Sequence, residues 1–91
     1  MKLKNKVAIV TGGGKGIGEE ISLGLAKEGA KVVVADLDKE NSSNVVKEIV
    51  KNNGDAIYVE TDVSNEASVK NLISETINRF DQMDILINNA C

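Results

Sequence analysis

The chain has 91 residues, of which 42% are hydrophobic and 27% charged, as expected for one small soluble globular domain. Its net charge of −3, without a basic stripe, gives no reason to expect nucleic acid binding. No apolar run approaches the roughly 20 residues of a membrane span, so neither a membrane segment nor a signal peptide is expected.

The cysteine and histidine content limits which disulfides, metal sites and catalytic groups the chain can form. The single cysteine, Cys91, cannot form an internal disulfide, which fits a reducing, cytoplasmic location. Histidine is absent, so neither a histidine-based metal site nor a Ser–His–Asp triad can be built from these residues. We therefore predict no metal site.

Short β-branched runs alternate with amphipathic segments along the chain. The predicted elements are, in order, strand 6–10, helix 16–28, strand 31–36, helix 39–53, strand 56–60, a helix ending at Phe80 and strand 84–88. Gly29 and Gly54 are predicted to end the first two helices, and Ser64 or Asn65 to cap the third. On the first helix the apolar face is predicted to hold Ile17, Ile21, Gly24 and Leu25.

The order of these elements, βαβαβαβ, predicts the fold class. Runs such as VAIV, VVVA and ILI are apolar on both faces and lack the alternation of a half-exposed strand. Strands of this kind, connected through helices, belong to parallel sheets that helices cover on both sides. The sequence therefore predicts an α/β fold with a Rossmann-type, doubly wound parallel sheet.

The segment TGGGKGIG, Thr11 to Gly18, joins the first strand to the first helix. The N-terminus of a helix carries unpaired backbone N–H groups and partial positive charge, so a phosphate binds there if no side chain blocks it. We expect Gly12 to make the tight exit from the strand, Gly16 to allow the cofactor near the backbone, and Gly18 to let the helix pack closely.

The spacing of these glycines excludes two common phosphate-binding motifs. No register of the segment satisfies G-x-G-x-x-G, and Lys15 is followed by Gly16 rather than by the Ser or Thr of a P-loop. A flexible turn without a ligand remains the alternative for the glycines alone. Asp36 favours nucleotide binding over a turn without a ligand, because an acid that ends the second strand can accept hydrogen bonds from both hydroxyls of the adenosine ribose. Its alternative role is a helix cap or a solvated loop acid.

At this point the chain resembles the single-domain branch of the short-chain dehydrogenase/reductase family. The family's T-G-x-x-x-G-I-G matches residues 11–18, its ribose-binding acid matches Asp36, its D-V pair matches Asp62 and Val63, and its N-N-A-G matches Asn88, Asn89 and Ala90. The resemblance implies a cofactor-binding set of Gly12, Gly14, Lys15, Gly16, Ile17, Gly18, Asp36, Leu37, Asp62, Val63, Asn89 and Ala90. It also implies that the 91 residues form the dinucleotide-binding first part of a larger three-layer domain.

Two departures from the family pattern affect function. Cys91 stands where N-N-A-G has its last glycine, and the family's catalytic Ser and Tyr-x-x-x-Lys, which follow that motif, have no match. The only tyrosine, Tyr58, is followed four residues later by Asp62 rather than Lys, so no catalytic residue is assigned. The chain alone is expected to be inactive. The alternatives to a part of an oxidoreductase are a freestanding dinucleotide-binding module and an inactive remnant.

For the cofactor, the sequence favours NAD over NADP. The Asp36 carboxylate would repel a 2′-phosphate, whereas Lys15, at a position where NADP-preferring family members often carry a basic residue, argues the other way. The resemblance implies a small carbonyl or alcohol as substrate. Any homo-oligomer is expected to depend on later helices of the family fold.

Overall fold

The computed structural model describes residues 1–89. Its elements are β1 (Val7–Thr11), α1 (Gly16–Lys27), β2 (Lys31–Asp36), α2 (Lys39–Lys51), β3 (Ala56–Glu60), α3 (Glu66–Phe80) and β4 (Ile85–Asn88). The order βαβαβαβ is the predicted one, and the bounds differ from the prediction by one or two residues. Within residues 1–89, no helix is both long and apolar enough to cross a membrane.

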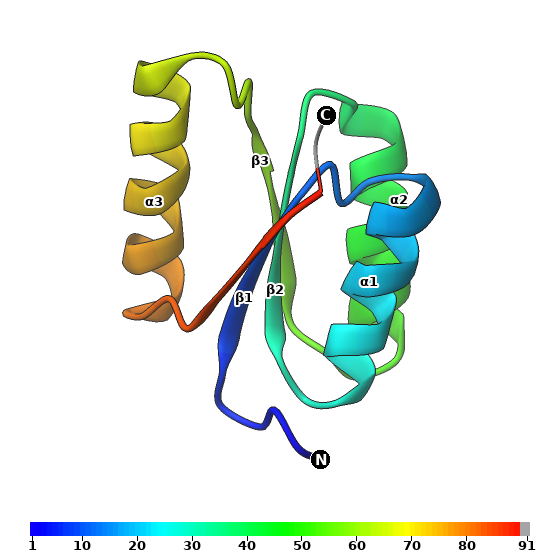
Figure 1. Cartoon of the computed structure of the whole chain (residues 1–91). Helices are drawn as coiled ribbons and strands as arrows, with labels where there is room; N and C mark the ends of the chain where they lie inside the picture. The colour runs from blue at the N-terminus through cyan, green and yellow to red at the C-terminus, as the bar shows by residue number, and fades with distance from the viewer. Residues whose placement is uncertain (90–91) are drawn as a thin grey trace.

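The strands form one parallel sheet in the order β3-β2-β1-β4. Helices α1 and α2 cover one face of this sheet and α3 covers the other, which gives three layers (Figure 1). Because the chain crosses from β1 to β2 and β3 on one side and then returns past β1 to β4, the sheet is wound in both directions. The predicted doubly wound α/β fold is confirmed.

Two hydrophobic cores lie on opposite faces of the sheet. Successive residues of β1 serve both, since Ala8 and Val10 pack beneath α1 and α2, whereas Val7 and Ile9 pack on the α3 side. All four of these side chains are at most 1% exposed. Burial on both faces explains why β1 and β2 consist of continuous apolar runs rather than alternating ones.

The helix ends follow from specific residues. Asn65, one of the two predicted candidates, caps α3 by accepting the Ser68 N–H at 2.9 Å. Gly29 ends α1 as predicted, with its N–H bonded to the Ala26 carbonyl at 3.0 Å. The end of α2 differs from the prediction, because the residue in the left-handed conformation is Asn53 (φ 70°) and not Gly54.

The buried face of α1 differs from the prediction in part, since Ile21 and Leu25 are half-buried and pack against the core as predicted. Its buried residues are Gly18 and Ser22, whereas Ile17 is 69% exposed and a Cβ on Gly24 would have no atom outside the local helix backbone within 4 Å. The Ser22 hydroxyl donates to the Gly13 carbonyl at 3.2 Å, which fastens the helix to the glycine segment. Small residues thus bring the start of α1 close to the sheet, and Ile21 and Leu25 pack against the core farther along the helix.

The β4 side of the sheet carries apolar surface. Among the described residues β4 pairs with β1 alone, and Leu86 of β4 is 60% exposed on the face that α3 covers elsewhere. On α3, Ile73 and Ile77 are each 41% exposed. An apolar edge strand without charge or proline is a template for intermolecular pairing.

We expect residues 1–91, expressed alone, to aggregate or to remain poorly packed, and Leu86→Lys to reduce this aggregation. The exposed position should tolerate the charge, with a change in unfolding free energy within about 0.5 kcal/mol. The matched variant Ile87→Lys changes the neighbouring residue, which packs against the core beneath α1 and α2, and should lower stability. Light scattering and urea unfolding measure both effects; a wild-type segment that stays monomeric at high concentration would contradict the expectation.

Candidate nucleotide-binding site

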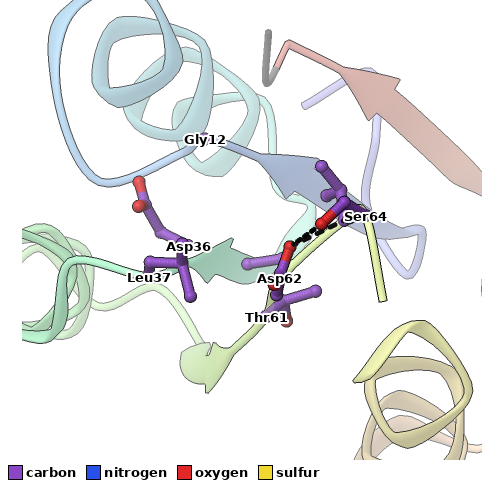
Figure 2. Close-up of a pocket in the computed structure, with 8 residues that line it drawn as sticks. Gly12, Asp36, Leu37, Thr61, Asp62 and Ser64 are labelled. Atoms are coloured by element: carbon purple, nitrogen blue, oxygen red, sulfur yellow. Dashed lines mark hydrogen bonds between the residues drawn. The ribbon is translucent and has the colours of Figure 1, made fainter. Parts of the chain in front are cut away.

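The carboxyl ends of the parallel strands meet at one edge of the sheet, and a cavity of about 250 Å³ opens there. Figure 2 shows it between the glycine segment and the loops that follow β2 and β3. Its lining residues are Gly12, Ala35, Asp36, Leu37, Thr61, Asp62, Val63 and Ser64. The topology therefore brings together residues that the sequence singled out at three separate places.

Two positions of the segment are occupied by glycine for different structural reasons. A Cβ on Gly18 would overlap the Gly12 carbonyl oxygen and lie 2.8 Å from Asn89 Nδ2, so no side chain fits between the helix and the end of β1. Gly16 has φ +59°, and a Cβ there would point into open space. Gly18 therefore allows close packing of the helix, and Gly16 leaves the backbone bare on the side where a ligand could approach.

The start of α1 differs from the other two helices described in residues 1–89. Asp38 caps α2 and Asn65 caps α3, but no described side chain caps α1 at Lys15. The first backbone N–H groups of α1 consequently have no partner within the helix or from a cap. They form a positively polarised end at the glycine segment, which suits a phosphate group.

Two backbone amides hold the Asp36 carboxylate in place. The N–H of Gly14 donates to Oδ2 and the N–H of Asp38 donates to Oδ1, each at 3.0 Å. A Cβ on Gly14 would overlap the buried Ser42 hydroxyl and lie 3.0 Å from Asp36 Oδ2, so this glycine allows the loop to reach the carboxylate. Figure 2 shows the Asp36 side chain pointing toward that loop.

The carboxylate uses only part of its capacity in these contacts. Each carboxylate oxygen has two lone pairs, so two acceptor positions remain after the two amides are satisfied. Two is also the number of hydroxyl groups on an unmodified nucleotide ribose. Asp36 therefore has the chemistry of a ribose-binding acid.

Asp62 lies across the cavity from Asp36. Its Oδ1 accepts hydrogen bonds from the Ser64 hydroxyl at 2.6 Å and from the Ser64 N–H at 3.0 Å (Figure 2). These bonds favour the charged form and lower the pKa of the Asp62 carboxyl below its usual value. The side chain of Ser68 on α3 accepts the N–H of Asp62 at 2.8 Å, which fixes the loop at its other end.

Asn89 connects the end of β4 to the glycine segment. Its N–H donates to the Thr11 hydroxyl at 2.9 Å, and its side-chain amide donates to the Gly12 carbonyl at 3.3 Å. The first glycine is thus held from β4 as well as from β2, where the Gly12 N–H donates to the Ala35 carbonyl at 2.7 Å. Ala90, the last predicted site residue, lies outside the described residues.

Three predicted site residues are apolar and exposed. Ile17, Leu37 and Val63 are 69%, 62% and 45% exposed, although each has a large apolar side chain. Leu37 and Val63 line the cavity, and Ile17 lies in the first turn of α1. Exposed apolar groups beside polar ones are typical of a surface that a ligand covers.

Tyr58 belongs to the sheet rather than to the cavity. It lies on β3, and its hydroxyl donates to the Asp36 carbonyl at 3.0 Å. Burial, together with the charges of Glu60, Asp36 and Asp38, raises the pKa of this hydroxyl above its usual value. Tyr58 therefore stays protonated at neutral pH and supports the end of β2.

Sequence reasoning missed several residues at this site. Thr61 and Ser64 line the cavity, and Asp38 forms an ion pair with the predicted Lys15, with 3.9 Å between Lys15 Nζ and Asp38 Oδ2. Ser64 could have been found from its place next to the Asp62-Val63 pair. Asp38 carried no signal of its own, because an acid before a helix is typical of an ordinary cap. No group of three or more His, Cys, Asp or Glu side chains within residues 1–89 is placed to hold a metal ion.

A parallel α/β sheet whose first helix begins bare at a glycine turn defines a Rossmann-type nucleotide-binding fold. Comparison with known families makes this more specific. Residues 6–91 match the model of the short chain dehydrogenases, and the chain belongs to this family of oxidoreductases.

Individual relatives agree with the family. The chain is 42% identical over 88 residues to an uncharacterized oxidoreductase of Thermotoga maritima, a match that covers 97% of this chain and 34% of the relative. A crystal structure of hydroxysteroid dehydrogenase from Escherichia coli has a TM-score of 0.96 at 39% identity, covering 99% of this chain and 38% of that one. A 3-ketoacyl-(acyl-carrier-protein) reductase from Brucella melitensis, solved with NADH, has a TM-score of 0.89 at 44% identity, covering 97% and 35%. The chain spans about a third of the length of these relatives.

Two glycines of α1 give a matched test of the packing. In the intact protein Gly18→Ala should lower the free energy of unfolding by about 2 kcal/mol or more and weaken nucleotide binding, because the new methyl group overlaps backbone. Gly24→Ala, at an open position of the same helix, should raise the free energy by about 0.5–1 kcal/mol. Urea unfolding measures both variants; equal stability for Gly18→Ala and wild type would show that α1 does not need this contact.

Proposed function

We propose that residues 1–91 form the dinucleotide-binding part of a nicotinamide-dependent oxidoreductase that interconverts a small carbonyl compound and an alcohol. The observation that carries the proposal is the uncapped N-terminus of α1, which faces bare glycine backbone next to a carboxylate fixed at the end of β2. The Brucella reductase that was solved with NADH supports it.

In this proposal the residues of the chain divide into four groups. The glycine segment and the first amides of α1, with Gly16, Ile17 and Gly18, receive the pyrophosphate. Asp36 accepts hydrogen bonds from the adenosine ribose, with Leu37 beside it. Asp62 and Val63 bind the adenine, and Asn89 binds near the second ribose.

The cavity fits these roles in size and polarity. It presents a carboxylate at each side, Asp36 and Asp62, and apolar groups, Leu37 and Val63, that could cover a flat aromatic base. When bound, the nicotinamide cofactor supplies the hydride chemistry. The described residues bind and orient the cofactor's adenosine and pyrophosphate half.

We further propose that the cofactor is NAD rather than NADP. Both Asp36 oxygens are held by backbone amides, so the carboxylate cannot easily turn away from a ribose at this position. A 2′-phosphate would meet this negative charge and would also remove one hydroxyl donor.

Cofactor affinities of the intact protein test this preference. Asp36→Ala should weaken NAD⁺ binding roughly 10- to 100-fold, because hydrogen bonds to a charged group are lost, and should reduce the preference for NAD⁺ over NADP⁺. Asp36→Asn is the matched control, since it removes the charge but keeps an acceptor oxygen, and it should lose less NAD⁺ affinity. An unchanged preference in Asp36→Ala, or wild-type protein that binds NADP⁺ as tightly as NAD⁺, would refute the assignment.

No residue among the 91 matches the Tyr-x-x-x-Lys pair that is expected to perform the acid/base step. In the proposed reaction a tyrosine, with a lysine four positions later, donates or accepts the proton of the substrate oxygen. Tyr58 cannot take this role, because its hydroxyl is committed to the Asp36 carbonyl. We therefore expect residues 1–91 alone to be catalytically inactive.

Absorbance of NADH with a panel of aldehydes and ketones tests this expectation. Residues 1–91 should give no detectable oxidation, whereas the intact protein should give turnover that falls by roughly 10²–10⁴-fold when the tyrosine of its Tyr-x-x-x-Lys is replaced by Phe. Turnover by the purified 91-residue segment would contradict the proposal, as would an intact enzyme that keeps its activity without that tyrosine.

A further inference from the structure

Lys15 and Asp38 connect the two loops beside Asp36. Lys15 is the last residue before α1, and Asp38 is the residue before α2. Their side chains form an ion pair with 3.9 Å between Lys15 Nζ and Asp38 Oδ2. Lys15 is also the only cation within the glycine segment, residues 11–18.

The pair is coupled by the backbone to the proposed ribose-binding acid. The two amides that hold Asp36 belong to Gly14, which precedes Lys15, and to Asp38 itself. Each residue of the ion pair therefore either donates its own N–H to the Asp36 carboxylate, as Asp38 does, or follows the residue that donates, as Lys15 does. A group attached to the ribose at this carboxylate would come close to both Lys15 and Asp38.

The charged side chains near Asp36 and Asp38 are mostly negative. The three carboxylates that act on the Tyr58 hydroxyl are those of Glu60, Asp36 and Asp38. Asp38 is stabilised in its charged form, and its pKa is lowered, first by the Asn41 amides and then by Lys15. Lys15 consequently faces the charged form of Asp38.

We propose that Asp38 is a second determinant of cofactor preference, which acts by engaging Lys15 and so withholding it from a 2′-phosphate. The proposal rests on the function proposed above. Asp36 acts by direct repulsion, whereas Asp38 acts through the lysine. A 2′-phosphate would have to displace Lys15 from Asp38 before it could gain from that lysine, and it would do so against the charge of Asp38.

The expected size of the effect follows from exposure. The Lys15 side chain is 69% exposed and that of Asp38 is 28% exposed, so water and salt screen the pair. Removing the charge of Asp38 should therefore improve NADP⁺ binding relative to NAD⁺ by about three- to tenfold at low salt. This is less than the effect expected for Asp36, which touches the ribose directly.

Asp38→Asn is the variant of choice. Asp38 also caps α2 by accepting the Asn41 N–H at 3.0 Å, and Asn is as good a cap as Asp, so the helix should be kept. Glu60→Gln is the matched control, because it removes a carboxylate near Tyr58 that has no ion pair with Lys15 among the described residues. Thermal unfolding verifies that each variant is folded.

The experiment measures dissociation constants of NAD⁺ and NADP⁺ by calorimetry on the intact protein, for Asp38→Asn, Lys15→Gln, the double variant and Glu60→Gln. The expected result is a three- to tenfold shift toward NADP⁺ in Asp38→Asn, which largely disappears in the double variant. Lys15→Gln alone should change NADP⁺ affinity less than twofold, because the lysine is already engaged. Glu60→Gln should shift the ratio less than Asp38→Asn does.

Three results would overturn the inference. They are an unchanged ratio in Asp38→Asn, the same shift with and without Lys15, and a large loss of NADP⁺ affinity in Lys15→Gln alone. Each leaves wild-type NAD⁺ binding intact and therefore leaves the proposed function standing. Wild-type protein that binds neither dinucleotide would instead remove the proposed function and this inference with it.

Discussion

The contact between Gly18 and the Gly12 carbonyl sets the geometry of the whole site. Because no side chain separates these residues, α1 begins directly at the carboxyl end of β1. The partial positive charge of the helix therefore points at the edge of the sheet where the other strands also end. A helix held farther from the strand by larger residues would not bring its first amides to the same edge of the sheet.

Hydrogen bonds then attach the surrounding loops to this fixed point. Asn89 holds the Gly12 carbonyl from β4, and the Ala35 carbonyl of β2 accepts the Gly12 N–H. On the far side of the loop, Asp36 accepts the Gly14 N–H. The glycine segment is therefore preorganised despite its composition, which reduces the conformational entropy that ligand binding would have to offset.

Much of the fold could be predicted from the sequence, because parallel strands buried on both faces give unmistakable apolar runs and the helices between them are amphipathic. The predicted sheet and the positions of Gly12, Gly18 and Asp36 at one edge follow from that topology. The predicted face of α1 was right for Ile21 and Leu25, which pack against the core. It was wrong for Ile17, because periodicity weighs large apolar residues and misses the packing of small ones such as Gly18 and Ser22. Asn53 was overlooked as the left-handed residue because Gly54 beside it is the commoner choice. The ion pair of Lys15 with Asp38 depends on how two loops approach each other, which no local pattern encodes.

The central claim is that the bare N-terminus of α1 and the fixed Asp36 carboxylate receive the two ends of an adenosine diphosphate group. A crystal structure of the intact protein with NADH tests it most directly. The account predicts pyrophosphate oxygens within hydrogen-bond distance of the first α1 amides and both adenosine ribose hydroxyls on Asp36. A dinucleotide bound elsewhere, or one whose ribose leaves Asp36 in contact with Gly14 and Asp38 alone, would contradict it.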